Sequence, residues 1–421
     1  MSNSAEAPVQ PLHRELGPLG VLFLTLSALS PGASVFVSSA SVVHSAGTGA
    51  ALGFLAGGAI AALVALLYAE LASSFPHAGG PYGSVSGVLG SRAGFIVQAL
   101  DLVSAPAFMA FTAWGFADYV HYLVPGVSSL SIGLAAIGVA TLLSILNLRT
   151  NAWITGAFLA VELLAILILS VVSLTHPVRS IGEVLLHPVL PGPQGLLPSP
   201  FAATALAVVG GSWACAGASW AMFFGEELRD APRRIGGVVV AAGVIAGILI
   251  GIPVAIFNCL VVSTIASSRF YYANGRDGIF PGPFNRVLTR LHARFASPWV
   301  ATLLLGAVGT SFCLLGERMN IHLLSGEVCS GPLVALSVWV GRRRGCTGQI
   351  GYRTPWFPLM PAFGLVAAAG LIVATIADRD AGRPSMMILL GVIAVASGYH
   401  QRVLKLRSWC IRHLSQPVPI P

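Results

Sequence analysis

The residues best suited to bind a ligand lie in one stretch, Trp213 to Arg234, where an apolar run is interrupted and then ends in charges. The interruption consists of small residues: Ala214, Cys215, Ala216, Gly217, Ala218 and Ser219. A helix that breaks in an apolar environment exposes backbone N–H and C=O groups, which is tolerated only where they line a cavity or are buried in protein. Interruptions of this kind form ligand sites near the middle of membrane spans. The stretch therefore predicts a binding site built partly from backbone.

The charges that follow the break are suited to form ion pairs. They are Glu226, Glu227, Arg229, Asp230, Arg233 and Arg234. Glu226 and Glu227 have potential partners in Arg229, Arg233, Arg234 and, further along the chain, Arg276. Such pairs would form a gate that closes one side of the molecule. The alternative is a solvated helix end, whose surface ion pairs contribute little free energy.

Carboxylates also lie inside apolar runs, where a charge is costly and usually functional. They are Asp101, Glu162 and Glu327. Glu162 lies about ten residues into its run, near the middle of a span at ~1.5 Å per residue. Because burial favours the neutral acid, Glu162 is a candidate to carry a proton, to bind a cation directly, or to serve as a protonated packing residue. Asp101 is a further coupling candidate, although for Asp101 and Glu327 we favour a structural role.

The composition indicates a polytopic membrane protein. Of 421 residues, 55% are hydrophobic and 9% are charged, and the mean hydropathy is +0.82, whereas soluble domains carry about 25% charged residues. The net charge of +8 is expected to reflect cytoplasmic loops, so no nucleic-acid partner is predicted. The cysteines lack C-x-x-C spacing, and P-loop, G-x-S-x-G and H-E-x-x-H motifs are absent from the sequence. We therefore expect no metal site, no cofactor and no enzymatic activity.

Eleven apolar runs approach or exceed the length needed to cross a bilayer, about 20 residues. They are Gly17–Val43, Ala50–Ser73, Ala93–Leu123, Leu130–Leu148, Ala152–Leu174, Pro200–Phe224, Ile235–Ser268, Trp299–Leu315, Leu323–Val340, Trp356–Ile376 and Met386–Ser397. The tail 1–16 is mostly polar and lacks a cleavable signal, so the first run is expected to insert the chain.

The run Ile235–Ser268 sets the number of spans at 11 or 12. Its 34 residues would make a straight helix of ~51 Å, too long for one pass, yet two passes of ~17 residues leave no loop. With a cytoplasmic N-terminus, two passes place all but four of the 23 Lys and Arg residues in the cytoplasm, together with the C-terminus. The positive-inside rule therefore favours two passes.

The first run echoes the sixth. Ser30-Pro31-Gly32-Ala33-Ser34 and Ala216-Gly217-Ala218-Ser219 both carry Gly-Ala-Ser in mid-run, 185 residues apart. Proline cannot donate to the helix ladder and glycine weakens it. Interrupted helices at corresponding places in two halves of a chain point to a binding site between them.

Four motifs give the chain a resemblance to the amino acid–polyamine–organocation (APC) superfamily of permeases. The residues 68–82, YAELASSFPHAGGPY, resemble the end of that family's second span, and 225–234, GEELRDAPRR, its sixth-span exit. Ser268-Arg269 with 276–281, RDGIFP, resembles the eighth-span exit, and 352–355, YRTP, the start of the eleventh. The motifs occur in the family's order over most of the chain.

The resemblance implies an all-α fold of five plus five inverted helices, like that of the leucine transporters, followed by two further helices. It divides the chain into a cytoplasmic tail 1–16, a first repeat 17–174, a second repeat 200–345, two additional helices in 352–400 and a cytoplasmic tail 401–421. It further implies a multi-pass protein of the plasma (inner) membrane with both termini in the cytoplasm.

The resemblance also implies secondary transport of an amino acid or amine by alternating access, with a proton as candidate co-substrate or by exchange. The substrate's charged groups would bind at the two breaks, in residues 30–34 and 213–218. The side-chain pocket would be shaped by Trp213 and Cys215, and enlarged by Ala218, where many relatives have an aromatic residue. Cation-coupled relatives use their eighth span, which here adds Ser263 and Thr264 to the coupling candidates.

The chain departs from the family between its sixth-span exit and its eighth-span motif. Relatives have two full helices and an external loop there, whereas Ile235–Ser268 is shorter by an estimated few dozen residues. An alternative interpretation is therefore a transport-inactive homologue, either a substrate sensor or an internally deleted remnant.

Overall fold

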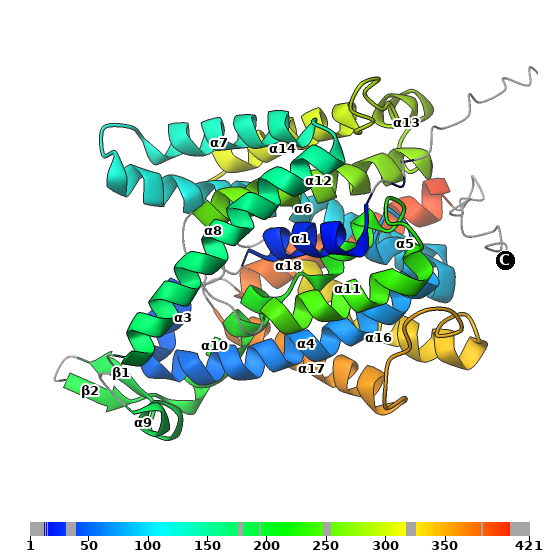
Figure 1. Cartoon of the computed structure of the whole chain (residues 1–421). Helices are drawn as coiled ribbons and strands as arrows, with labels where there is room; N and C mark the ends of the chain where they lie inside the picture. Colours follow the sequence, from blue (N-terminus) through cyan, green and yellow to red (C-terminus); the bar gives the residue numbers. More distant parts are fainter. Residues whose placement is uncertain are drawn as a thin grey trace, which may run out of the picture.

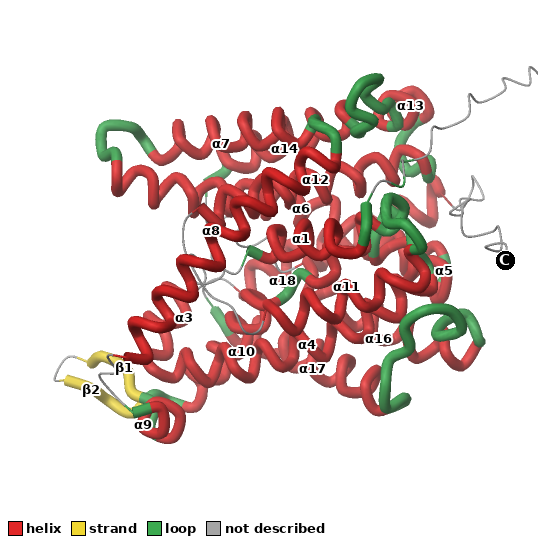
Figure 2. The backbone as a smooth tube through the Cα atoms, viewed as in Figure 1, coloured by secondary structure: helices red, strands yellow, loops and turns green. Residues whose placement is uncertain are grey.

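The computed structural model describes residues 12, 14, 16–30, 39–175, 180–192, 195–246, 254–316, 326–379 and 382–404. Within these residues the chain forms a bundle of helices packed side by side, with one small hairpin at its edge (Figures 1 and 2). One large core of buried apolar residues runs through the bundle, with contributions from helices at both ends of the sequence.

In the first half of the chain, each of the five apolar runs contains a helix. Its helices are α1 (Pro18–Leu29), α3 (Ser39–Ala46), α4 (Ala50–Ser74), α5 (Pro81–Leu89), α6 (Ser91–Leu123), α7 (Ser129–Ser144) and α8 (Leu148–Thr175), with the 3₁₀ turn η2 (Gly47–Gly49). Short α5 was not predicted, because its sequence PYGSVSGVL is too polar and too short to read as a span.

The connection between the two halves is ordered at one end of the bundle. It forms α9 (Ile181–Leu186) and the antiparallel strands β1 (Val189–Gly192) and β2 (Gly195–Pro198), which hydropathy did not predict. Ser180 and Glu183 form a capping box at the start of α9, which satisfies two backbone donors reciprocally. The hairpin touches the bundle at Gly47, where a methyl group would lie only 2.1 Å from the carbonyl oxygen of Val189.

The second half repeats the pattern of long apolar helices. Its elements are α10 (Phe201–Cys215), η3 (Ala218–Phe224), α11 (Ala231–Ala246), α12 (Val254–Arg276), α13 (Gly282–Leu288), α14 (Trp299–Leu314), α16 (Gly326–Arg344), α17 (Leu359–Ala377), α18 (Gly382–Tyr399) and the π-helical turn η4 (His400–Leu404).

Apolar helices of membrane-spanning length confirm the class predicted from composition. In the described part of the chain, six helical segments are long and apolar enough to cross a membrane: Val42–Ser74, Ser91–Leu123, Leu148–Val172, Phe201–Phe224, Leu359–Ala377 and Gly382–Leu404. Shorter apolar helices, Pro18–Leu29, Ser129–Ser144 and Trp299–Leu314, accompany them.

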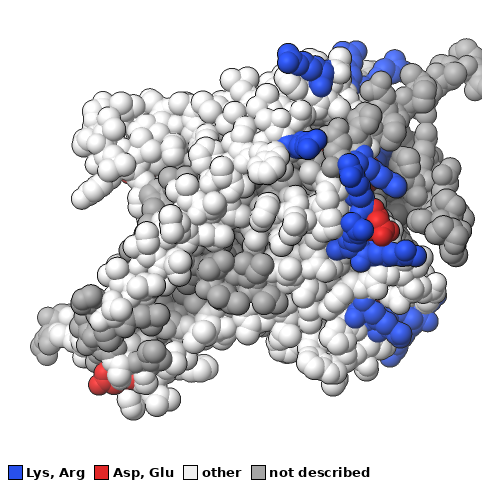
Figure 3. All heavy atoms as spheres, in the orientation of Figure 1, with Lys and Arg blue, Asp and Glu red and all other residues white. Residues whose placement is uncertain are grey.

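Charge is distributed along the bundle axis as a membrane protein requires. On the face shown in Figure 3, Lys and Arg gather at the end where α5 and α13 lie in Figure 1, and the body between the two ends is free of charge. We call this end of the molecule the basic end.

The run Ile235–Ser268 forms two helices rather than one. Both helices extend beyond the run, since α11 begins at Ala231 and α12 continues to Arg276. The start of α11 lies five residues after Glu226, and Arg276 at the end of α12 donates to Glu226 at 2.5 Å. The chain therefore leaves the basic end and returns to it, as the charge count favoured. The expected bounds were too narrow because charged residues at helix ends lower local hydropathy.

Both predicted interruptions lie at helix ends in the structure. The first helix stops at Leu29, and Ser30 takes a left-handed conformation with φ 36° and ψ 86°. In the sixth run, α10 stops at Cys215, Ala216 is extended, and Gly217 has φ 128° before η3 begins. Pro31, Gly32, Ala33 and Ser34 lie outside the described residues.

Backbone contact between α4 and α10 fixes the position of the broken helix. A methyl group at Gly57 would lie 2.3 Å from the amide nitrogen of Ser212, and one at Gly211 would lie 2.4 Å from the carbonyl oxygen of Gly53. Glycine is required at such places because it lets two helix backbones touch.

We expect Gly57→Ala and Gly211→Ala each to destabilise the protein by about 1–3 kcal/mol, because overpacking forces the two helices apart. Thermal unfolding in detergent micelles measures the effect. Gly138→Ala on α7 is the matched control, since a methyl group there would meet no atom within 4 Å. Equal melting temperatures for all three variants would contradict the close α4–α10 contact.

Candidate functional site

The two helix breaks lie against each other. A methyl group at Gly217 would come within 2.7 Å of Leu29 Cδ2 and 3.0 Å of Trp220, so the two breaks are closely packed. Its φ of 128° would also strain the backbone of any residue other than glycine. Because Ser30 follows Leu29 directly, the breaks predicted from residues 30–34 and 213–218 belong to one place in the fold.

The carboxyl group of Glu162 faces the first break. Glu162 lies on α8, is only 1% exposed, and accepts a hydrogen bond from Ser30 Oγ at 3.3 Å. On α12, Cys259 donates its thiol to the carbonyl oxygen of Ala28 at 3.0 Å. The end of α1 is thus held between α8 and α12, with a buried acid at the point where its helix stops.

Aromatic rings from α6 pack against the second break. Trp213, the last aromatic residue before the break, stands edge-on to Phe111 at 5.6 Å and to Phe108 at 6.4 Å between ring centroids. Trp220, just beyond it, lies 5.6 Å from Phe108. Trp213 therefore lies between the second break and α6, and its role in shaping a substrate pocket stays a prediction.

A cavity of about 100 Å³ lies against the break among α4, α10, α16 and α17. At ~10–15 Å³ for one water position, it has room for a small organic group. Five predicted substrate-binding residues contribute to its wall: Trp213, Cys215, Ala216, Gly217 and Ala218. Ala214, which was also predicted, is buried but does not line this cavity.

The other walls of the cavity are apolar. They come from residues such as Val64 and Tyr68 on α4, Val334 on α16 and Leu371 on α17, and among the described residues no Asp, Glu, Lys, Arg or His lines the cavity. Ala218 lines this cavity, and an enlarged substrate pocket at this position stays a prediction. The cavity suits an uncharged aliphatic group.

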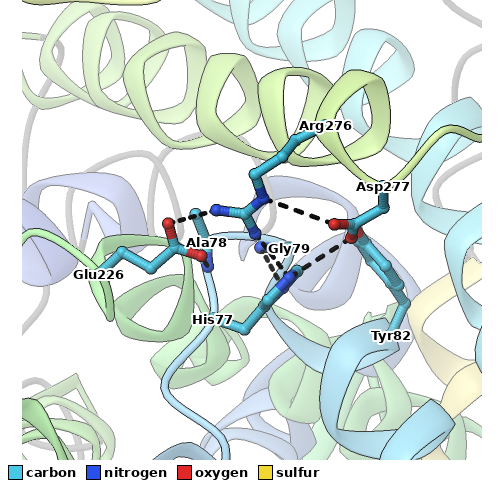
Figure 4. A network of polar contacts seen from close by, with 7 residues as sticks. All are labelled: His77, Ala78, Gly79, Tyr82, Glu226, Arg276 and Asp277. Atoms are coloured by element: carbon cyan, nitrogen blue, oxygen red, sulfur yellow. Dashed lines mark hydrogen bonds and ion pairs between the residues drawn. The ribbon is translucent and has the colours of Figure 1, made fainter. Parts of the chain in front are cut away.

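At the basic end, five ionisable side chains form one network, which we call the basic-end network (Figure 4). Arg276 at the end of α12 donates to Glu226 Oε2 at 2.5 Å, and its Nη2 lies 2.6 Å from His77 Nε2. Asp277 Oδ2 accepts a hydrogen bond of 2.5 Å from the hydroxyl of Tyr82 and lies 3.4 Å from His77 Nε2. The network joins the end of α12 to the α4–α5 connection and to the turn after η3.

The surroundings of the basic-end network hold its acids in the charged form. Burial opposes ionisation of Asp277, but His77, Arg276 and the Tyr82 hydroxyl outweigh it and lower its pKa to about 2. Burial likewise opposes ionisation of Glu226, yet Arg276 and His77 lower its pKa below the ordinary value. Burial, followed by the charge of Asp277, raises the pKa of Tyr82 well above 10, so its hydroxyl remains a donor.

The predicted ion partners of the charged cluster were partly wrong. Glu226 pairs with Arg276, as expected, but Glu227 forms a buried bridge of 3.1 Å with Arg269 on α12. Arg269 also donates to the carbonyl oxygen of Ile265 and to Ser268 Oγ. Arg229 is exposed and donates to the carbonyl oxygen of Arg14 at 3.4 Å instead of to a carboxylate. The turn after η3 directs Glu227 inward and Arg229 outward, which spacing alone does not reveal.

A second buried ion pair joins α4 to α16. Arg342 donates to both oxygens of Glu70, at 2.7 Å from Nε and 2.6 Å from Nη2. Thr347 Oγ1 and the Thr354 amide donate to the same carboxylate at 3.0 and 2.8 Å. We call these four residues the Glu70 clamp.

The remaining predicted residues lie apart from these groups or outside the described side chains. Ser263 and Thr264 on α12 donate their hydroxyls to Leu260 of their own helix, at 3.1 and 2.7 Å. Asp101 is half-buried on α6, and its coupling role stays a prediction. The side chain of Glu327 is outside the description. Among the described residues, no cluster of three His, Cys, Asp or Glu side chains could hold a metal ion.

Sequence reasoning missed His77, Tyr82, Asp277, Glu70 and Arg342 as functional residues. His77, Tyr82, Glu70 and Asp277 lie in family motifs that were quoted for their resemblance alone, and Arg342 lies ten residues before the motif 352–355. Polar residues concentrated at the ends of apolar runs were the available signal. Their pairing could not be read, because Glu70 and Arg342 are 272 residues apart.

Apolar helices with two interrupted spans and buried polar groups define an integral, multi-pass membrane protein. Comparison of the sequence with known families is more specific: the model of the family described as amino acid permease matches residues 16–265. The chain therefore belongs to the amino acid permease family, within the APC superfamily.

Similar proteins include characterised permeases from bacteria and animals. The branched-chain amino acid permease BcaP of Bacillus subtilis is 22% identical over 86% of this chain and 88% of its own length. The large neutral amino acids transporter small subunit 2 of Mus musculus is 27% identical over 73% of this chain and 66% of its own. The human Asc-type amino acid transporter 1 is 28% identical over 53% and 44%, respectively.

Removal of one partner from the basic-end network should cost far more than removal of a surface pair. We expect Arg276→Gln to destabilise the protein by about 3–5 kcal/mol, because it leaves buried acids unpaired. Asp230→Asn is the control, since the Asp230–Arg234 pair at 3.8 Å is about half exposed and is expected to contribute about 0–1 kcal/mol. Melting temperatures in detergent compare the two, and equal losses would contradict the buried network.

Proposed function

We propose that this protein is a secondary transporter of neutral amino acids with aliphatic side chains, working by alternating access. The observation that carries the proposal is the junction of two interrupted helices beside an apolar cavity. Family membership supports amino acid transport, and the names of its relatives refer to branched-chain and large neutral amino acids.

The proposal includes the family's architecture of five plus five inverted helices followed by α17 and α18. Interrupted helices at corresponding places of the two halves support it, with α1 ending at Ser30 and α10 at Cys215. The alternative of an internally deleted remnant loses its main argument, because residues 231–276 contain two helices.

Substrate recognition would divide between backbone and side chains. The carbonyl ends of α1 and α10 would receive the ammonium group, and the N-terminus of η3 would receive the carboxylate. The aliphatic side chain would then enter the cavity, where Val64, Val334 and Leu371 lie and where the described lining contains no Asp, Glu, Lys, Arg or His.

The basic end would face the cytoplasm, because positive charge gathers there on the face shown in Figure 3. In the described structure its polar groups are joined across α4, the turn after η3, and α12. The basic-end network and the Glu227–Arg269 bridge would then act as a gate that is closed in this conformation and opens during release.

Glu162 is the candidate for proton coupling. It is buried at the end of α1, so a change of its charge would be felt directly at the first break through Ser30. Uptake of a proton removes the cost of a buried charge, which links protonation to the packing around α1.

The substrate proposal is tested by uptake of labelled leucine and alanine into proteoliposomes. We expect both to be taken up by the wild type, and Ala218→Trp to lower leucine uptake at least about tenfold relative to alanine by filling the cavity. Val366→Trp adds the same bulk on the exposed outer face of α17 and is the control. If the wild type takes up no amino acid, the transport proposal fails; an unchanged ratio in Ala218→Trp removes only the pocket.

The coupling proposal is tested by Glu162→Gln, which keeps the size and hydrogen-bonding shape of the side chain but cannot titrate. We expect it to abolish accumulation driven by a pH gradient while leaving exchange of internal for external leucine. Ser30→Ala is the companion variant, since it removes the recorded hydrogen bond without removing the acid. Gradient-driven accumulation that persists in Glu162→Gln would take Glu162 out of the coupling mechanism.

A further inference from the structure

We propose that the Glu70 clamp is a specificity-determining device: it fixes the spacing of three walls of the apolar cavity and so selects for large aliphatic substrates. This proposal rests on the proposed function, because it concerns the same cavity. Its carrying observation is that one carboxylate binds three segments, and each segment continues into a wall of that cavity.

The carboxylate of Glu70 has four donors and is fully buried. Arg342 is anchored further, because its Nη2 also donates to the Thr354 carbonyl at 2.7 Å and its guanidinium lies 5.2 Å from the centre of the Phe357 ring. A fork-shaped guanidinium on a carboxylate fixes orientation as well as distance. The clamp therefore holds α4, the end of α16 and the segment leading to α17 in one arrangement.

The clamp lies next to the cavity along all three helices. Tyr68, which lines the cavity, is two residues before Glu70 on α4, and Ala335 is seven residues before Arg342 on α16. Seven residues correspond to about 10 Å of helix. On α17, the cavity residue Gly364 follows ten positions after Thr354.

The three helices also touch between the clamp and the cavity. A methyl group at Gly364 would lie 2.5 Å from Leu67 Cδ1 and 3.3 Å from Ala335 Cβ, so α17 sits directly against α4 and α16. A shift at the clamp cannot be absorbed there by loose packing. It would move the opposing walls, which consist of short side chains such as Gly331 and Ala368.

This position differs from that of the basic-end network. The network joins α12 to the α4–α5 connection and the turn after η3, whereas the clamp joins α4, α16 and α17. The side chain of Arg342 is 8% exposed and that of Glu70 0%, against 20% for Glu226. The clamp therefore sets the shape of the cavity, whereas the basic-end network belongs to the proposed gate.

The test compares leucine and alanine transport by clamp variants. Thr347→Val removes one hydrogen bond to Glu70 Oε1, and Arg342→Lys keeps the charge but removes the two-pronged contact. We expect the leucine-to-alanine ratio of kcat/KM to fall about twofold in Thr347→Val and at least about fivefold in Arg342→Lys. The loss should appear in KM for leucine, with kcat for alanine within twofold of the wild type.

Arg343→Gln is the matched control, because Arg343 is the exposed neighbour of Arg342 and its guanidinium lies over the Trp339 ring at 5.3 Å. It should leave the ratio unchanged. Equal losses for leucine and alanine in Arg342→Lys would show a general structural role and overturn the proposal, as would an unchanged ratio.

A second readout does not depend on transport. Spin labels at Ala59 on α4 and Leu336 on α16, both exposed, report the distance between two cavity walls after replacement of exposed Cys346 by Ser. We expect a narrow distribution in the wild type and in Arg343→Gln, and a broader or shifted one in Arg342→Lys. Identical distributions would overturn the clamp proposal even if leucine transport itself were established. Absence of leucine and alanine uptake in the wild type would instead refute the proposed function.

Discussion

The contact between Gly217 and Leu29 is the constraint on which the rest of the site depends. Two helices stop where they meet, and the φ of 128° at Gly217 requires glycine there to avoid backbone strain. The exposed backbone groups of a broken helix must form hydrogen bonds within the protein or line a cavity. Each break therefore needs neighbours that stay in place. Glu162 and Cys259 supply them for α1, and the glycine contact with α4 supplies them for α10.

The features that the sequence predicted well are those with a local cause. Proline, glycine and small residues in mid-run located both breaks, and apolar length located most helices. The run 235–268 was difficult because its helices begin and end in charged segments, 231–234 and 269–276, which hydropathy excludes. The hairpin 189–198 was missed because its four-residue strands are too short for a periodic pattern.

Partners of buried charges were the least predictable part of the site. The Glu227–Arg269 bridge and the Glu70–Arg342 pair join residues 42 and 272 positions apart, and only the packing of helices brings them together. From the sequence alone, Arg229, Arg233 and Arg234 are equally plausible ion-pair partners for Glu226 and Glu227. In the fold, the direction of each side chain at the turn after η3 decides the outcome, with Glu227 buried and Arg229 exposed.

The break in α10 is bordered by apolar groups on both sides. Toward α6 lie the rings of Phe108 and Phe111 against Trp213, and toward α4, α16 and α17 lies the apolar cavity. The buried acid belongs to the other break, at Ser30. A charge within the cavity would have to be desolvated with every apolar substrate, at a cost of several kcal/mol. In the proposed mechanism, the titratable group on α8 and the apolar walls on other helices would let one junction of broken helices serve both roles.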